Sequence, residues 1–192
     1  MITIRCERAS DVDAREALLD DAFGDTRYRK ASERLREDRL PAEGLAFVAA
    51  EGKRVTGTAR LWDIACGSSQ PALLLGPVAV AADCRNRGIG AALVRRAIAA
   101  ARKLGHAAIV LVGDAPYYGR FGFTSEKTGA LWMPGPFERH RLLALELVPG
   151  ALDGACGMIG ATGRLVPKPD LAALVAQDAR SERSRRRRPR AA

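Results

Sequence analysis

Residues 85–91 read Arg85-Asn86-Arg87-Gly88-Ile89-Gly90-Ala91 and join an apolar run to an amphipathic segment. The run before them, Leu73 to Val80, is short, apolar and contains β-branched residues, which predicts a strand. The segment after them, Gly88 to Leu104, places apolar residues at helical spacing and is followed by Gly105, which predicts a helix that ends there. The sequence therefore predicts a strand, a glycine-containing loop and a helix in immediate succession.

The predicted loop has the composition of an anion-binding site. The first turn of a helix carries N–H groups without intrahelical partners, and the helix dipole places partial positive charge there. Gly88 and Gly90 keep side chains away from those N–H groups, while Arg85 and Arg87 can donate charge-assisted hydrogen bonds to phosphate oxygens. The predicted ligand is therefore a phosphate group.

Spacing separates three kinds of phosphate site. A nucleotide P-loop requires Lys and Ser/Thr directly after its last glycine, but Ala91 and Ala92 follow Gly90. A dinucleotide fingerprint requires a small residue where Leu93 stands and an acidic residue about 20 positions on, and residues 108–111 are apolar instead. What remains is an Arg-x-x-Gly-x-Gly/Ala arrangement that follows a strand.

That arrangement resembles the pyrophosphate-binding motif of the GNAT superfamily of N-acetyltransferases. Val78-Ala79-Val80 matches the family strand before the motif, and residues 107–112 match the next strand. The stretch Tyr117-Tyr118-Gly119-Arg120-Phe121-Gly122-Phe123 matches a short helix and the Tyr-x-x-x-Gly-Phe signature. These segments occur in the family's order, and the resemblance spans roughly residues 2–148.

The resemblance implies an α/β fold, the GNAT acyl-CoA N-acyltransferase fold. Its central sheet would be mixed and mostly antiparallel, flanked by helices and splayed at the cofactor site. Acetyl-CoA would be the acyl donor, with its pantetheine arm beside residues 78–80 like an extra strand, and the N–H of Val80 would polarise the thioester carbonyl. No metal is implied. The implied cofactor-binding residues are Val78, Ala79, Val80, Arg85, Asn86, Arg87, Gly88, Ile89, Gly90 and Ala91.

Tyr118 matches the general-acid tyrosine of the family by its position in the signature. A phenol has a pKa of about 10, close to that of a thiol, so it can protonate a leaving thiolate. Simple packing beside Phe121 and Phe123 is the alternative role for this side chain. Asp114, just past a predicted strand, is a candidate general base, although aspartate is also common in turns because it forms local hydrogen bonds.

The remaining elements follow from periodicity and from turn residues. A helix is predicted from the cap at residues 10–13 to Phe23, and a second, highly charged helix is predicted after Thr26 and before Pro41. That second helix either borders the acceptor site, as in the resembling family, or simply presents a solvated face. The predicted strands outside the motif are Thr3–Cys6, Leu45–Ala50, Val55–Ile64, 107–112 and Leu142–Leu147.

Three regions are predicted along the chain. Residues 1–148 form the GNAT domain, and residues 149–178 form a C-terminal extension packed on or near it. The glycine-rich part of this extension, about 150–166, fits a lid, a dimer contact or an added strand, and residues 171–177 are predicted to form a short helix. Residues 179–192 form an arginine-rich tail that lacks apolar residues for packing and is predicted to be disordered.

Composition excludes several protein classes. The 192 residues are 47% apolar but contain no apolar run of membrane-spanning length, and no signal-peptide pattern opens the chain, so a cytoplasmic location without membrane contact is expected. The four cysteines are widely separated, which argues against zinc or a disulfide framework. The net charge of +9 is concentrated in the tail, where residues 180–190 hold seven arginines and one glutamate. Nucleic-acid binding is therefore expected only as nonspecific contact by the tail.

The sequence thus predicts an acetyl-CoA-dependent N-acetyltransferase that acts on a primary amine by direct attack in a ternary complex. Small amines, amino-acid derivatives, aminoglycoside-like drugs, and protein N-termini or lysines all remain possible acceptors, and the acyl-chain length and a homodimer remain open. The alternative is a CoA-binding regulatory protein with the same fold and little turnover. A nucleic-acid-binding protein dominated by the tail is a third hypothesis, which no helix-turn-helix, zinc-finger or RNP pattern supports.

Overall fold

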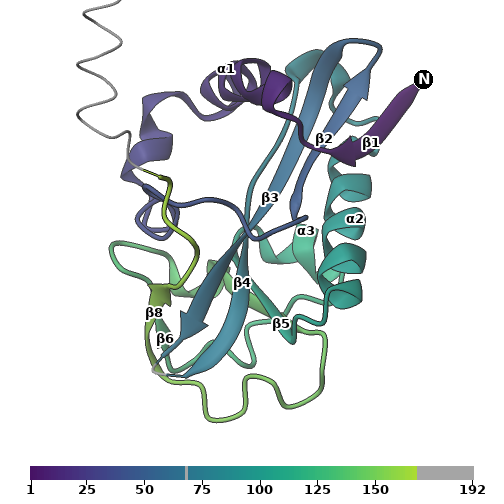
Figure 1. Cartoon of the computed structure of the whole chain (residues 1–192). Coiled ribbons are helices and arrows are strands. Elements are labelled where there is room, and N and C mark those ends of the chain that lie inside the picture. Colours follow the sequence, from purple (N-terminus) through teal and green to yellow (C-terminus); the bar gives the residue numbers. More distant parts are fainter. Residues whose placement is uncertain (68, 168–192) are drawn as a thin grey trace, which may run out of the picture.

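The computed structural model describes residues 1–67 and 69–167, which form an eight-stranded sheet (Figure 1). The strand order is β1-β2-β3-β4-β5-β7, with β8 paired to the far end of β3 and β6 paired to β8. Central neighbours are antiparallel except β4 and β5, which confirms the predicted mixed, mostly antiparallel sheet. The strands are β1 (Ile2–Cys6), β2 (Ala46–Glu51), β3 (Arg54–Cys66), β4 (Gln70–Val80), β5 (Ala108–Val112), β6 (Leu131–Trp132), β7 (Leu142–Glu146) and β8 (Gly157–Ala161).

The two long helices cover opposite faces of this sheet. Successive strand residues point to opposite faces, and Phe47 and Arg60 belong to neighbouring cross-strand pairs of β2 and β3. Arg96 of α2 (Ile89–Lys103) lies over the Phe47 ring, at 5.5 Å from its centre. Arg15 of α1 (Val12–Phe23) lies 3.6 Å from the carboxylate of Glu7, which also pairs with Arg60. The predicted boundaries of both helices are confirmed to within two residues.

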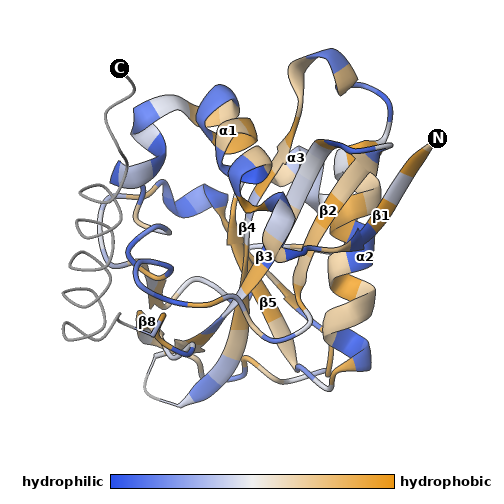
Figure 2. Cartoon of the chain, turned by 45° about the horizontal axis from the view of Figure 1, so that its top comes forward, coloured by the Kyte–Doolittle hydropathy of each residue, from blue (hydrophilic) through white to orange (hydrophobic). Residues whose placement is uncertain are grey.

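Apolar residues of α2 and the strands build the main core (Figure 2). Leu93 and Ala97 of α2 are completely buried, whereas Arg95 and Arg102 on its outer side are exposed, as the amphipathic pattern predicts. Gly57 on β3 lets the helix approach closely, because a Cβ there would lie 2.9 Å from Leu93 Cδ1. No helix of the described residues is long and apolar enough to cross a membrane.

The sheet splays open between β4 and β5. These strands pair only at Leu73 with Ile109 and at Leu74 with Val110, and then diverge. The register between β3 and β4 shifts at Gly76 and Pro77, which makes a bulge that bends β4 away from β5. The predicted splay is therefore present, and a gap opens beside the last residues of β4.

The prediction of a helix after Thr26 is wrong. Residues Gly24–Arg29 form a 3-10 helix, and residues 30–38 form successive turns in place of α-helix. Hydrogen bonds between residues three positions apart, such as that from the Glu33 N–H to the Lys30 carbonyl, stabilise these turns. Asp38 adopts a left-handed φ of 55°. Ala31 and Leu35 are buried, but Tyr28 is 59% exposed. The burial of these two apolar residues therefore outweighs the helical periodicity of the segment.

The C-terminal extension supplies an added strand. β8 pairs with residues 64–66 of β3 and with β6, and the chain then runs beside the turns at residues 38–40. There the Leu40 N–H donates to the Arg164 carbonyl at 2.8 Å, and the Val166 N–H donates to the Asp38 carbonyl at 2.8 Å. The predicted helix at 171–177 and the arginine-rich tail lie outside the described residues.

Candidate functional site

The predicted phosphate loop encloses a cavity of about 550 Å³ in front of the first turn of α2. We call it the loop cavity. It is open to the surface, and residues from β4, the loop, α2 and the segment after β5 form its walls. Its lining residues are Val80, Cys84, Arg85, Asn86, Gly88, Ile89, Gly90, Ala91, Tyr117 and Arg120.

The backbone of the loop is arranged to bind an anion. Asn86 and Gly88 adopt left-handed φ values of 61° and 77°, and the Ala92 N–H is the first that donates within the helix, to the Gly88 carbonyl. Helix geometry therefore leaves the N–H groups of residues 89–91 without intrahelical acceptors at the cavity wall. Space at Gly90 is tight, because a Cβ there would lie 3.1 Å from the Tyr117 hydroxyl.

The sequence-predicted cofactor residues do not all face this cavity. Arg87 lies outside its lining, with its guanidinium 3.5 Å from the carboxylate of Glu51 and 3.6 Å from Cys84 Sγ. Hydrogen bonding to Glu51 raises the pKa of Arg87. The side chain of Ala79 is buried in the core, and Val78 lines a different cavity, described below.

The edge of β4 presents backbone groups to the gap. The Ala81 N–H donates to the Thr56 carbonyl of β3 at 2.9 Å. Backbone groups alternate in direction along a strand, so those of Ala79 also face β3, and those of Val78 and Val80 face the opposite side. On that side β5 has already diverged, which leaves the Val78 and Val80 groups without a strand partner in the described residues.

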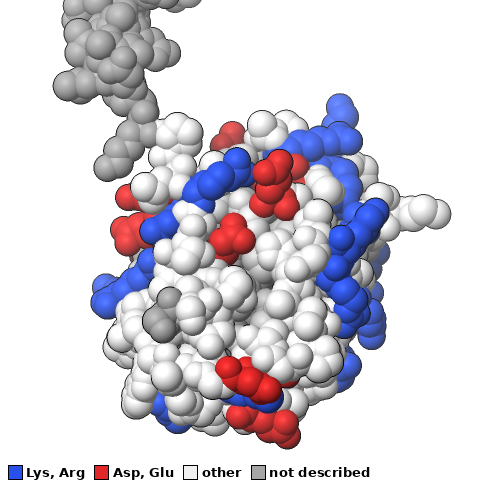
Figure 3. All heavy atoms as spheres, turned by 60° about the horizontal axis from the view of Figure 1, so that its bottom comes forward, with Lys and Arg blue, Asp and Glu red and all other residues white. Residues whose placement is uncertain are grey.

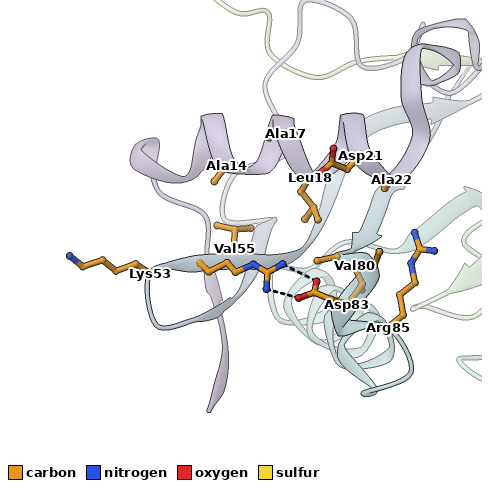
Figure 4. Close-up of a pocket in the computed structure, with 13 residues that line it drawn as sticks. Ala14, Ala17, Leu18, Asp21, Ala22, Lys53, Val55, Val80, Asp83 and Arg85 are labelled. Carbon is orange, nitrogen blue, oxygen red and sulfur yellow. Dashed lines mark hydrogen bonds and ion pairs between the residues drawn. The ribbon is translucent and has the colours of Figure 1, made fainter.

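A second cavity, the helix cavity, lies beneath α1 and adjoins the loop cavity at Val80 and Arg85 (Figure 4). Small residues of α1, among them Ala14 and Ala17, form one wall, as the close-up shows. A bidentate pair between Arg54 and Asp83, at 2.7 and 2.8 Å, joins the β2–β3 turn to the loop. Arg85 therefore stands at the boundary of two cavities.

A third cavity, the gap cavity, occupies the splay between β4 and β5 and has a volume of about 290 Å³. The bulge of β4, the end of β5, the turns after α1 and Arg141 surround it. Its lining residues are Phe23, Arg27, Lys30, Ser32, Arg36, Leu75, Gly76, Pro77, Val78, Val112, Gly113, Asp114, Tyr118 and Arg141.

Tyr118 belongs to α3 (Ala115–Gly119), and its side chain lines the gap cavity. Its ring packs against Tyr117 at 5.0 Å and Phe123 at 6.0 Å between ring centres, so packing and a chemical role are compatible. Burial is the main cause that raises the pKa of Tyr118 to about 12; Tyr117 and Asp114 act in the same direction, and Arg141 opposes them. The phenol is therefore protonated at neutral pH and is a weaker acid than a free tyrosine.

Asp114 is the N-cap residue of α3. Its carboxylate accepts a hydrogen bond from the Tyr117 N–H at 3.2 Å, which is the local turn role weighed for it from the sequence. It also lines the gap cavity beside Tyr118. In the described part of the chain, no three His, Cys, Asp or Glu side chains are close enough to hold a metal ion, and all four cysteines are free thiols.

Sequence reasoning missed most of the gap cavity's wall. The sequence predicts Arg27, Lys30 and Arg36 on one charged helix, more than 100 residues before Arg141, yet the fold brings all four to one cavity. The only signal was the unusual number of charges between residues 27 and 39. Tyr117 was also missed as part of the loop cavity, where the Arg120 guanidinium stacks 4.1 Å above the Tyr117 ring centre.

The chain is similar in sequence to a known protein family and to a protein of Escherichia coli. The profile of the Acetyltransferase (GNAT) family matches residues 12–123. "Uncharacterized N-acetyltransferase YhbS" of Escherichia coli strain K12 is 28% identical over 156 residues, which are 81% of this chain and 93% of that protein.

Two solved structures are similar over most of the chain. The YhbS structure from Escherichia coli in complex with CoA has a TM-score of 0.71 and 27% identity, and covers 84% of this chain and 89% of its own. A GNAT family acetyltransferase from Brucella melitensis in complex with acetyl-CoA has a TM-score of 0.64 and 26% identity, over 84% and 96% of the two chains.

Proposed function

The chain belongs to the GNAT family of acetyltransferases, and from this we propose that it transfers an acetyl group from acetyl-CoA to a primary amine, which attacks the thioester directly in a ternary complex. The observation that carries the proposal is the continuity of three features. The loop cavity, the free backbone edge at Val78 and Val80, and the gap cavity with Tyr118 follow one another from the loop into the sheet.

Each part of the proposed donor has a chemically suitable partner along this path. The N–H groups of residues 89–91 and the guanidinium of Arg85 suit the pyrophosphate. The unpaired backbone groups of Val80 and the Val78 carbonyl suit the amides of the pantetheine arm, because an extended chain can pair with a free strand edge. With the arm paired in this way, we propose that the thioester lies in the gap, beside the residues that line the gap cavity.

Different residues then act in different steps of the proposed reaction. The N–H of Val78, which lines the gap cavity, donates to the carbonyl oxygen in place of the Val80 N–H that the family resemblance implies, and it stabilises the negative charge that develops when the amine nitrogen bonds to the carbonyl carbon. As the carbon–sulfur bond breaks, Tyr118 donates its proton to the sulfur, and the acetylated nitrogen loses a proton. Asp114 is placed to accept that proton directly or through water.

Binding of the donor is the first test of the proposal. We expect isothermal titration to give micromolar affinity for acetyl-CoA and CoA, and Arg85→Ala to weaken both about 10-fold, the value of one charge-assisted hydrogen bond. Arg102→Ala, an exposed arginine near the other end of α2, is the matched control and is expected to bind as the wild type does.

Two outcomes would contradict this expectation. A folded wild type that binds neither compound would overturn the proposal. Tight binding without thiol release from acetyl-CoA, across anionic, neutral and cationic amines, would favour the CoA-binding regulator.

The ring position of Tyr118 provides a second prediction. A Cβ on Gly113 would lie 2.3 Å from Tyr118 Cε2, so Gly113→Ala must displace the ring. We expect kcat to fall about 10-fold, because small misplacements of reacting groups are costly, with acetyl-CoA affinity retained. Gly119→Ala is the control, since a Cβ at Gly119 meets no atom within 4 Å. Equal kcat in the two variants, measured by thiol release, would argue against a role for the Tyr118 position.

A further inference from the structure

The gap cavity is lined by more cations than anions. Arg27, Lys30, Arg36 and Arg141 line it, and Asp114 is the one carboxylate among its lining residues. The face shown in Figure 3 has a wide uncharged centre, with basic residues on both flanks and acidic residues in separate groups. The lining of the gap cavity is, by contrast, rich in cations.

Arg36 is the most informative of these cations. Its side chain is only 6% exposed, and one terminal nitrogen donates to Glu33 at 2.6 Å. Its Nε has no hydrogen-bond partner in residues 1–67 and 69–167. The other terminal nitrogen, Nη1, approaches the bulge of β4, 3.6 Å from where a Cβ of Gly76 would stand. A buried guanidinium thus reaches the cavity wall with donor capacity to spare.

Arg27 extends the same arrangement. It pairs with Glu16 and Asp20 on α1, but its Nε also lacks a partner in the described part of the chain. A small cavity of about 150 Å³ on the far side of Arg27 and Arg36 shares both residues with the gap cavity. Both arginines therefore bring a guanidinium group to the wall of the gap cavity, where an acceptor-rich ligand can bind it.

Lys30 adds a further positive charge to the cavity lining. Its ammonium lies 4.3 Å from the centre of the Phe23 ring, and no carboxylate of the described residues lies within ion-pair distance. Burial lowers the pKa of Lys30, and Arg36 and Arg141 lower it further, while Glu33 opposes them. Three cations therefore act on the same small volume.

This electrostatic environment selects among amines. A second cationic group on an acceptor would be repelled, whereas a carboxylate or phosphate would pair with Arg36 and Lys30. The same cations lower the pKa of a bound amine, which favours the neutral, nucleophilic form that the proposed transfer requires.

We propose that the acceptor is a small primary amine that also carries a carboxylate or phosphate group, which Arg36 and Lys30 bind while the amine faces Tyr118. The inference rests on the proposed acetyl transfer and names its substrate class. It disfavours aminoglycoside-like drugs, polyamines and lysine-rich proteins, which present several positive charges.

Matched acceptors test the proposal by turnover. One pair is glycine and glycinamide, which isolates the carboxylate, and another is phosphoethanolamine and ethanolamine, which isolates the phosphate; spermidine represents polycations. We expect kcat/KM to be at least about 10-fold higher for the anionic member of at least one pair, the value of one charge-assisted contact. Higher kcat/KM for the neutral members or for spermidine would overturn the inference and leave acetyl transfer intact.

Lys30→Gln tests the assigned binding residue. The side chain is exposed and its loss should not unfold the protein. We expect KM for the preferred anionic acceptor to rise about 10-fold with kcat and acetyl-CoA affinity retained, because one charge-assisted contact is lost. Lys103→Gln, on the outer side of α2, is the control. An unchanged KM in Lys30→Gln would contradict the assignment.

A binding experiment keeps the test independent of turnover. N-acetylglycine and N-acetylglycinamide are titrated into protein saturated with CoA, so that the phosphate loop is already occupied. We expect only the carboxylate to bind, and Arg36→Gln to abolish its binding while CoA still binds. Equal affinity for both probes would refute the inference. Failure of the folded wild type to bind CoA would instead refute the proposed function.

Discussion

Tyr118→Phe is expected to lower kcat at least about 100-fold, the usual range for loss of a general acid, with acetyl-CoA affinity within about twofold of the wild type. The substitution removes only the hydroxyl, and the ring contacts with Tyr117 and Phe123 remain. Because the thiolate must then leave without a proton donor, the loss should appear in kcat rather than in binding. Single-turnover thiol release with the preferred acceptor measures it directly.

A neighbouring variant distinguishes this role from packing. A pKa of about 12 keeps the Tyr118 phenol protonated through the alkaline range, so we expect no fall in wild-type kcat from this group below about pH 10. Tyr117→Phe removes the neighbouring hydroxyl, which faces the loop cavity, and is expected to retain kcat within about threefold because it takes no part in proton transfer. Equal losses in the two variants would identify the effect as disturbed packing.

Gly90→Val is expected to weaken acetyl-CoA binding at least about 100-fold, because it obstructs several backbone donors at once. Its Cβ would stand 3.1 Å from the Tyr117 hydroxyl and 3.5 Å from Val80 Cγ2, so we expect the two further methyl groups to extend into the loop cavity that Gly90 lines. There they would cover the N–H groups of the first turn of α2. Titration calorimetry with acetyl-CoA measures the loss.

Gly90→Ala is the matched control. It adds only the Cβ, which a small movement of the Tyr117 hydroxyl can accommodate, so we expect a change of less than about fivefold. Near-ultraviolet circular dichroism would show whether both variants keep the packing of the tyrosines. Acetyl-CoA binding by Gly90→Val at wild-type strength would exclude the first turn of α2 as the pyrophosphate site.

The loop and its flanking elements could be predicted because their signals are local. The glycine spacing, the apolar period of α2 and the strand before them all lie within about 35 consecutive residues, and each is decided by near neighbours. The position of Tyr118 follows equally from a short signature that ends at Phe123. The family match was therefore visible without coordinates.

The acceptor side could not be predicted in the same way. Residues 26–40 carry helical periodicity, but the burial of Ala31 and Leu35 against strands from the rest of the chain outweighs it. The cations of the gap cavity come from segments more than 100 residues apart, Lys30 and Arg141, and no local pattern links them. The added strand β8 was one of three possibilities because glycine-rich segments carry little periodic signal.

The hydrogen bonds between residues 38–40 and 164–166 bear on the order in which the molecule is completed. The proposed donor site needs only β2 to α3, whose contacts are formed within residues 46–123. The wall that carries Lys30 and Arg36, by contrast, is fastened by partners about 125 residues further along the chain. Contacts of such high sequence separation form late and are the last to become available during synthesis. A chain emerging from the ribosome would thus acquire the site for one substrate before the site that selects the other.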